Sequence, residues 1–314
     1  MWMHTSAELA QVPTIWLHTG AEPTRATAMW MHTSAEPARA TATWMHTGAE
    51  PVHAPAMWMY AGAEPARETV QERKYNMNWK ERTERIIGAE AVKKLADCAV
   101  AVFGLGGVGS FAVEALARAG IGHFLLVDAD TVEETNLNRQ LVALRSTLGK
   151  PKTEVMAARI ADINPDAIVE PRQLFYLPET AADFDFTAFD YVVDAVDTVA
   201  AKLDLAERAH RDGVPIISCM GAGNKLDPTA FRVADIHQTK VDPLCRILRK
   251  KLRERGIPHL RVVYSEESPI SPQGETVATS DRRRHATPGS VSFVPSVAGL
   301  ILAGEVIRAL VGKG

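Results

Sequence analysis

The sequence predicts a doubly wound α/β fold, with helices on both faces of a mostly parallel sheet. Three observations support this. Expected strands and helices alternate from residue 99 to residue 219, the pattern that builds a parallel sheet. A glycine-rich turn at residues 104–109 joins the first of these strands to a helix. Residues 191–197 are almost continuously apolar, as expected of a central strand covered on both faces.

The glycine turn predicts an anion site. Its glycines are Gly104, Gly106, Gly107 and Gly109. Gly104 permits the tight turn off the strand, Gly106 lets backbone approach a phosphate, and Gly109 lets the helix pack closely on the sheet. The first amides of the helix, at residues 108–112, then face the anion.

Two acids follow the second strand of this unit. The apolar run at residues 124–127 is followed by Asp128 and Asp130, and an acid at the end of this strand accepts hydrogen bonds from a ribose. A glycine motif alone is weak evidence, but here two strands and an acid frame it. The sequence therefore predicts a nucleotide site in a Rossmann-like fold, and it does not say which nucleotide.

The remaining elements can be placed in chain order. Apolar periodicity and turn residues predict helices at residues 78–95, 153–163, 199–211 and 295–311, and strands at residues 167–170, 191–197 and 215–219. From residue 220 we expect an irregular, antiparallel C-terminal extension, with strands at residues 231–235 and 260–265 around a basic helix at residues 243–255. The loop at residues 269–288 carries Pro, Gly, Ser and Arg, and we expect it to be mobile.

The first quarter of the chain repeats with a period of fourteen residues, marked by Trp2, Trp16, Trp30, Trp44 and Trp58. A recurring proline prevents a continuous helix, and each unit has too few large apolar residues to bury a core. We therefore expect residues 1–76 to be disordered and residues 77–314 to form the folded domain. One histidine in most units raises the question of metal binding, but this spacing lacks the clustering of metal ligands.

Composition limits the compartment and the partners. A formal net charge of −3 gives no global field that favours nucleic acid. The three cysteines include no Cys-x-x-Cys pair, which excludes a structural zinc site of that kind and fits a reduced, cytoplasmic protein. The N-terminus lacks a secretory pattern, and no run of eighteen apolar residues predicts a membrane span. We expect a soluble protein with no membrane association.

Two segments are strongly basic although the net charge of the chain is slightly negative. Basic side chains crowd residues 246–255 and again residues 282–285. The ordinary interpretation is a solvated helix face and a solvated loop. Two basic clusters outside the nucleotide site are also what a polyanionic substrate requires.

Amide and cationic side chains follow the acids. Asn136, Arg139 and Gln140 come shortly after the second strand, and Lys152 starts the next helix. Arginine and lysine both hold phosphate oxygens, and Asp197, just past a central strand, is suited to hold Mg²⁺ together with waters. Taken singly, Asp197 is equally a helix cap, Lys152 a surface lysine and Asn136 a turn residue. Taken together, they predict a triphosphate site.

These residues carry a resemblance to a known family. The segments G-L-G-G-V-G-S, D-A-D, T-N-L-N-R-Q, K-P-K and D-A-V-D-T resemble the ubiquitin-activating-enzyme-like superfamily (ThiF, MoeB and HesA), which adenylates carboxylates. Residues 221–229, 242–244, 263–267 and 288–295 more specifically resemble the tRNA threonylcarbamoyladenosine dehydratases. The resemblance spans residues 79–310 and leaves out the repeats.

The resemblance implies a reaction and a set of roles. ATP would adenylate the carboxylate of the threonylcarbamoyl group on the adenosine beside the anticodon of tRNA. The activated carbonyl would then close to a cyclic form with release of AMP and net loss of water. In this resemblance Asp128 holds the ribose, Asn136, Arg139 and Lys152 hold and polarise phosphates, and Asp197 holds Mg²⁺.

The resemblance also implies partners. Arg82 matches an arginine that relatives insert from the partner subunit, which implies a homodimer, and a cysteine desulfurase or sulfur-acceptor system is a further partner to consider. One departure concerns thiol chemistry. Some members have a cysteine just before residues 264–266, where this chain has Val262 and Val263. We infer that direct cyclisation needs no enzyme thiol, and we expect Cys219 to belong to the core.

Three other functions stay open at this point. The first is adenylation of the C-terminus of a ubiquitin-like sulfur-carrier protein, against which the basic clusters and the lack of Cys-x-x-Cys pairs weigh. The second is a nicotinamide dehydrogenase, which would not need the polar set between residues 136 and 152. The third is a non-catalytic RNA-binding protein that retains the nucleotide fold.

Overall fold

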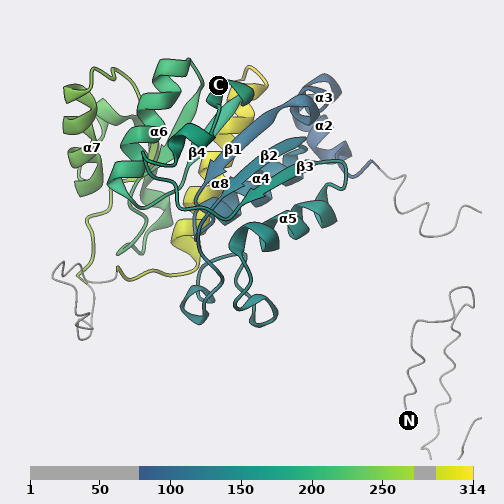
Figure 1. Cartoon of the computed structure of the whole chain (residues 1–314), viewed down its shortest axis with the longest axis horizontal. Coiled ribbons are helices and arrows are strands. Elements are labelled where there is room, and N and C mark those ends of the chain that lie inside the picture. The colour runs from purple at the N-terminus through teal and green to yellow at the C-terminus, as the bar shows by residue number, and fades with distance from the viewer. Residues whose placement is uncertain (1–77, 272–287, 314) are drawn as a thin grey trace, which may run out of the picture. The chain divides into compact units, whose positions relative to one another are not determined.

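The structure is a computed structural model that describes residues 78–271 and 288–313 (Figure 1). The fourteen-residue repeats, the basic residues 282–285 and most of the loop that we expected to be mobile lie outside this part of the chain. The division into residues 1–76 and 77–314, and the disorder expected of the repeats, therefore stay predictions. All elements below belong to one unit, which begins at Asn78.

Seven strands of the described residues form one sheet, so the predicted α/β fold is confirmed. They are β1 (Ala99–Phe103), β2 (His123–Val127), β3 (Ile168–Arg172), β4 (Tyr191–Asp194), β5 (Ile216–Cys219), β6 (Phe231–Asp235) and β7 (Arg261–Ser265). Their order is β3-β2-β1-β4-β5-β7-β6, with β6 antiparallel to β7 and the other pairings parallel. The chain order reverses between β1 and β4. Ligands of such sheets bind outside the carboxyl ends of the strands at this switch point.

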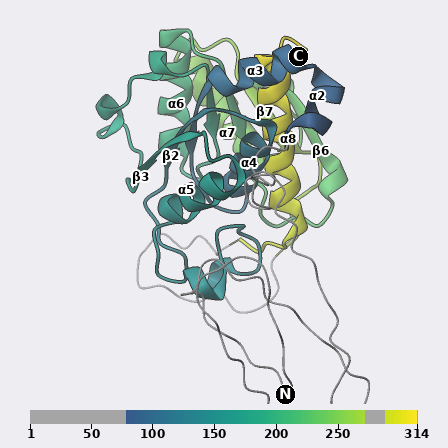
Figure 2. The ribbon, with the colours of Figure 1, turned by 90° about the vertical axis from the view of Figure 1, so that its right-hand side faces the viewer.

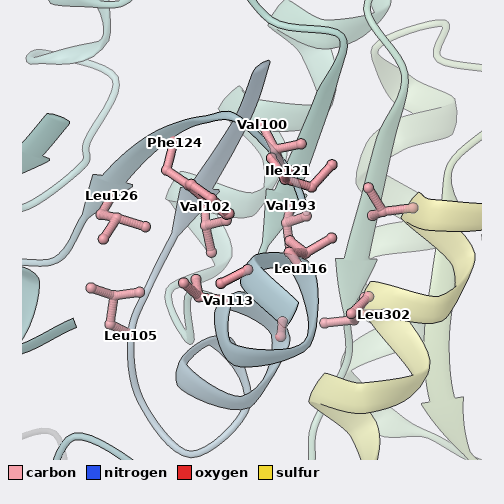
Figure 3. Close-up of a cluster of buried hydrophobic side chains, with 14 of the residues drawn as sticks. Val100, Val102, Leu105, Val113, Leu116, Ile121, Phe124, Leu126, Val193 and Leu302 are labelled. Carbon is pink, nitrogen blue, oxygen red and sulfur yellow. The ribbon is translucent and has the colours of Figure 1, made fainter. Parts of the chain in front are cut away.

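Helices cover both faces of the sheet. They are α2 (Glu81–Ile87), α3 (Ala89–Asp97), α4 (Gly109–Ala119), α5 (Lys152–Ile163), α6 (Val199–Asp212), α7 (Pro243–Glu254) and α8 (Phe293–Leu310). Successive side chains of a strand point to opposite faces. Val100 and Val102 of β1 therefore pack with α4 and α8 (Figure 3), whereas Ala101 and Phe103 pack with α6 on the other face.

Three boundaries differ from the sequence-based expectation. The helix expected at residues 78–95 is two helices, because Gly88 has φ 94° and ψ 151°, which no helix contains. The strand expected at residues 191–197 ends at Asp194, where the chain turns against the glycine loop. The expected C-terminal extension is part of the main sheet, because β7 pairs in parallel with β5.

Helix α8 closes the fold. Among the described helices it alone is long and apolar enough to cross a membrane by length and composition. In this structure it lies along α4 (Figure 2) and buries Val294, Ala298 and Leu302 completely. A Cβ on Gly299 would lie only 2.2 Å from the carbonyl oxygen of Val108, so the two helices pack almost backbone to backbone. The apolar composition of α8 is that of a core helix.

Candidate active site

The glycine turn joins the ends of β1 and β4 at the switch point. Gly104 has φ +89°, and a Cβ there would lie 2.6 Å from the carbonyl oxygen of Ala195. A Cβ on Gly109 would lie 1.8 Å from the carbonyl oxygen of Gly104. A side chain at either place would push the turn and the loop after β4 apart. These two glycines shape the turn, as the sequence predicts.

Of the other two glycines, Gly106 faces open space and Gly107 is closely packed. A Cβ on Gly106 would have one neighbour within 4 Å, the Nε2 atom of Gln140 at 3.8 Å. A Cβ on Gly107 would lie 3.2 Å from Pro295 and 3.4 Å from Cγ of Arg139. The space over Gly106 is where a phosphate can approach the backbone. The side chain of Gln140 borders that space, and Arg139 lies beside the neighbouring Gly107.

Asp128 ties the end of β2 to the glycine turn. Its Oδ2 accepts a hydrogen bond from the backbone N–H of Leu105 at 2.6 Å, and its Oδ1 accepts one from Asp130 at 2.8 Å. Each carboxylate oxygen keeps a lone pair for a further donor. Burial raises the pKa of Asp128, and the positive charge of Lys152 opposes that rise. The predicted ribose acceptor therefore lies beside the turn with free acceptor capacity.

Lys152 is buried beside the same acids. Its Nζ donates to Oδ2 of Asp130 at 2.7 Å and lies 3.9 Å from Oδ1 of Asp128, and its side chain is 4% exposed. A backbone hydrogen bond from Lys152 to Asp130 fixes the start of α5 at this place. An ammonium has three protons, so these contacts leave donor capacity for a phosphate. The alternative of an ordinary surface lysine is wrong.

Arg139 and Gln140 lie at the edge of the turn. Nη1 of Arg139 donates to the carbonyl oxygen of Thr135 at 2.9 Å and to Oδ1 of Asn138 at 3.0 Å. Nδ2 of Asn138 in turn donates to the carbonyl oxygen of Ser290 at 3.0 Å, which ties this segment to the chain before α8. Gln140 is buried, and its Oε1 has no hydrogen-bond partner among the described residues. A buried acceptor without a partner is costly, which is expected where a ligand supplies the missing donor.

Asn136 is placed differently from the sequence-based role. It is 7% exposed, and its Oδ1 accepts a hydrogen bond from the backbone N–H of Glu133 at 3.2 Å. The side chain thus holds the 3₁₀ turn at Glu134–Asn136 in shape. A direct contact from Asn136 to a phosphate stays a prediction.

Asp197 lies on the β4 side of the turn. It follows Ala195, whose carbonyl oxygen lies against Gly104, and its side chain is exposed. Its one side-chain hydrogen bond in the described residues comes from Oγ1 of Thr198 at 3.2 Å. The N-cap of α6 is Thr198, so the alternative that Asp197 caps this helix is wrong. Arg139, Lys152 and Asp197 thus come from three segments that adjoin the glycine turn.

Arg82 is not part of this cluster. It is exposed on α2, next to Glu81. Lys80, at the start of the same helix, contacts Gly120 at the C-terminal end of α4. The glycine turn lies at the N-terminal end of α4, and eleven helical residues span about 16 Å. Within one chain, Arg82 therefore lies at the opposite end of the domain from the site.

The sequence reasoning missed a buried ion pair behind the site. Nζ of Lys202 in α6 lies 3.1 Å from both carboxylate oxygens of Asp194, and each side chain is 1% exposed. Oγ of Ser218 also donates to Asp194, and Lys202 donates to the carbonyl oxygen of Cys219 at 2.6 Å. Oδ1 of Asp194 accepts from the backbone N–H of Val196 at 3.1 Å. The pair thus holds the loop that carries Asp197. The only sign of it in the sequence was a lysine on the apolar face of the helix that became α6.

The cysteines are not placed for nucleophilic chemistry. Cys219 is 3% exposed, and burial raises its pKa to about 12. Val262 and Val263, which stand where some relatives have a cysteine, are fully buried in β7. A thiol needs its thiolate form to act as a nucleophile, so Cys219 belongs to the core, as expected.

Comparison with known proteins extends the likeness over the whole described domain. The model of the ThiF family matches residues 80–314. A tRNA threonylcarbamoyladenosine dehydratase of Bacillus subtilis (strain 168) is 48% identical over 236 residues, which cover 73% of this chain and 93% of the relative.

Solved structures show the same likeness. The Escherichia coli tRNA N6-threonylcarbamoyladenosine dehydratase in complex with ATP has a TM-score of 0.68 and 33% identity, and the match covers 79% of this chain and 98% of that one. The same enzyme in complex with AMP has a TM-score of 0.67 and 35% identity, with 75% and 96% covered. The matched neighbours therefore bind the nucleotides that the glycine turn, the acid and the two cations predict.

Proposed function

This chain belongs to the ThiF family, and we propose that it is an ATP-dependent tRNA threonylcarbamoyladenosine dehydratase. The observation that carries this proposal is the match at 48% identity over 93% of a dehydratase of that name. The geometry of the site supports it, because Asp128, Lys152 and Arg139 border one glycine turn. Adenylation of a sulfur-carrier protein, the alternative, is not favoured by these matches.

The reaction has two steps. A carboxylate oxygen of the threonylcarbamoyl group attacks the α-phosphorus of ATP, and the bond to pyrophosphate breaks. A nucleophilic atom of the same threonylcarbamoyl group then attacks the activated carbonyl and loses its proton, and AMP leaves with the former carboxylate oxygen. The nucleoside loses the atoms of one water, and the energy comes from the phosphoanhydride bond of ATP.

The cations of the site fit the first step. The phosphorus gains negative charge on its oxygens as the carboxylate attacks, and fixed positive groups that face it lower the barrier. Lys152 is buried and held by Asp130, so it needs little reorganisation to act. Arg139 is held by Thr135 and Asn138 at the edge of the same turn. We assign these two side chains to the phosphates and Asp128 to the ribose.

Asp197 fits a magnesium ion. Its carboxylate is exposed beside the glycine turn and pairs with no cation among the described residues. That part of the chain contains no group of three metal-ligating side chains, and Mg²⁺ commonly binds through one or two carboxylates, waters and substrate phosphates. Bound there, Mg²⁺ would neutralise phosphate charge and orient the leaving pyrophosphate.

Arg82 supports a homodimer. The family resemblance assigns an arginine at this place to the partner's site, and in this chain Arg82 cannot reach its own glycine turn. We propose a two-fold dimer in which each Arg82 completes the partner's site.

Two further proposals concern the cellular compartment and a protein partner. The three cysteines are free and buried, as expected in a reducing compartment, and we place the protein in the cytoplasm. A cysteine desulfurase or sulfur-acceptor partner rests on the family resemblance alone. It is tested by whether such a pair changes the rate of dehydration in a purified system.

Exchange of labelled pyrophosphate into ATP tests the proposed function. Exchange should require tRNA that carries threonylcarbamoyladenosine and should be absent with unmodified tRNA. Exchange that depends instead on the C-terminus of a small ubiquitin-like protein would establish the alternative and reject the dehydratase proposal.

A further inference from the structure

Helix α7 presents a basic face that the nucleotide site does not use. Its residues Cys245, Leu248 and Leu252 are buried against α6 and β7, so one face is fixed in the core. Asp242 caps the helix by accepting a hydrogen bond from the backbone N–H of Cys245 at 2.9 Å. The helix is therefore rigidly mounted, and its opposite face is open.

The open face carries a row of cations. Arg246, Lys250 and Arg253 recur at intervals of four and three residues, so they lie along one side of the helix, and all three are exposed. Within the described residues, Arg246 and Arg253 have no ion-pair partner, and Lys250 has only a contact of 3.9 Å with Glu254. We call Arg246, Lys250 and Arg253 the α7 row.

The spacing of this row is not that of an ordinary solvated helix. Such helices gain stability when opposite charges stand three or four residues apart, and they lose stability when like charges do. In α7, Arg246 and Lys250 stand four apart, and Lys250 and Arg253 stand three apart. The whole chain has a net charge of −3, so this row is a local concentration of positive charge and not a general property of the surface.

The helix that carries the row begins at the edge of the sheet where the site lies. Oδ2 of Asp242 would lie 3.7 Å from a Cβ on Gly221, and Gly221 follows the carboxyl end of β5. Helix α7 also packs beside α6, which starts just after Asp197 (Figure 1). From that edge α7 extends for twelve residues, and the seven residue steps from Arg246 to Arg253 span about 10 Å. Phosphates of a nucleic acid strand recur often enough along such a length to meet several cations.

We propose that the α7 row binds the sugar-phosphate backbone of the substrate RNA while the modified base lies at the nucleotide site. The proposal rests on the proposed function, because it names the surface that holds the RNA of that reaction. A backbone contact of this kind positions the RNA and carries no sequence information. Charge complementarity favours RNA over an acidic protein, because the row is extended and regular, as a phosphate backbone is.

The test compares two triple variants of the full chain. The first is Arg246→Gln, Lys250→Gln and Arg253→Gln. The control is Lys93→Gln, Lys94→Gln and Lys313→Gln, which removes three exposed positive charges from α3 and the C-terminus. Binding of modified tRNA is measured between low and moderate salt, together with ATP affinity, KM for tRNA and kcat.

We expect the first variant to bind tRNA more weakly and to raise KM for tRNA, with ATP affinity and kcat at saturating tRNA unchanged. The slope of log affinity against log salt should become shallower by roughly two to three, because each lost phosphate contact accounts for about 0.7–0.9. The control should keep the slope of the unaltered protein. Arg246→Lys with Arg253→Lys, which keeps the charge, should keep most of the affinity.

Two results would overturn the proposal. One is an unchanged salt slope in the first variant. The other is an equal loss in the control, which would show that only total charge matters. Unchanged ATP affinity shows that each variant is folded. If the triple variant does not fold, the charge-preserving variant still tests whether positive charge on α7 is needed for tRNA binding. If the unaltered protein removes no water from modified tRNA, the proposed function fails. If it does so and the α7 variant binds normally, only the docking surface fails.

Discussion

The ammonium group of Lys202 lies 3.1 Å from both carboxylate oxygens of Asp194, in a place where neither side chain is more than 1% exposed. The same carboxylate accepts a hydrogen bond from the backbone N–H of Val196, directly before Asp197. The ion pair thus connects the core of α6 with the loop that borders the glycine turn.

Lys202→Met should destabilise the protein strongly. It leaves the carboxylate of Asp194 buried without its cation, and breaking a buried pair in this way costs about 3–5 kcal/mol. Urea unfolding measures the loss. The double variant Asp194→Leu with Lys202→Met is the control, because replacing both charges by apolar groups costs far less. A single variant that loses less than about 1 kcal/mol would contradict the assigned role of the pair.

Gly109→Ala should disturb folding, whereas Gly106→Ala should weaken ATP binding. The new methyl group at Gly109 would meet the carbonyl oxygen of Gly104 at 1.8 Å, so we expect loss of folding or a displaced turn. The methyl group at Gly106 has free space, with Gln140 at 3.8 Å. This variant should keep its melting temperature and bind ATP more weakly by roughly tenfold or more, because one charge-assisted hydrogen bond is worth about 1.5–3 kcal/mol. Equal ATP affinity in the Gly106 variant and the unaltered protein would argue against a phosphate at this glycine.

ATP affinity should fall on acidification through Asp128. Burial holds the pKa of this carboxyl above its ordinary value of 3.8, so the ionised form that accepts ribose hydroxyls is lost at a higher pH than in an ordinary aspartate. Since the folded-state pKa is the higher one, protonation of Asp128 does not itself unfold the protein. Calorimetric titration with ATP, repeated from neutral to acidic pH, measures the loss of ATP affinity. Asp128→Asn should bind weakly and show no such pH dependence, and a matching pH dependence in both proteins would reject the role of Asp128.

Removing the thiol of Cys219 should leave turnover intact. Burial raises the pKa of this thiol to about 12, so very little of it is in the thiolate form at neutral pH. Cys219→Ala should keep kcat within about twofold, and alkylating agents should modify the native protein slowly, because only the thiolate reacts. Loss of turnover in a variant that still binds ATP would mean that the reaction passes through an enzyme thiol.

Mixing two inactive variants tests the shared site. Arg82→Ala and Lys152→Ala should each be inactive as homodimers. If each Arg82 serves the partner's site, a mixed dimer has one site with both residues intact, so an equal mixture should regain about a quarter of full activity. No recovery after subunit exchange would contradict the exchange of Arg82 between subunits.

The sequence alone predicted the sheet and the position of the glycine turn, whereas the roles of the site residues stay predictions. Apolar runs that end in glycines or in an aspartate located β1, β2 and the glycine turn, because apolar residues fill buried strands and glycines permit a tight turn. The ion pair of the buried Lys202 was not predicted, because the partner of a lysine on an apolar helix face is visible only in the three-dimensional structure. The side chain of Asn136 holds a 3₁₀ turn through its hydrogen bond with Glu133, and its predicted contact with a phosphate stays a prediction. The proposed contribution of Arg82 to a partner's site depends on a second chain, so it stays a prediction.

In the proposed reaction, ATP activates the carboxylate of a threonylcarbamoyl group on tRNA. The most direct test is mass spectrometry of the products after incubation with ATP and Mg²⁺, using tRNA whose threonylcarbamoyl carboxylate carries heavy oxygen. We predict a nucleoside lighter by one water and AMP that contains one heavy oxygen, and neither product with Lys152→Ala. A dehydrated nucleoside with unlabelled AMP, or no loss of water at all, would contradict activation of the carboxylate by ATP.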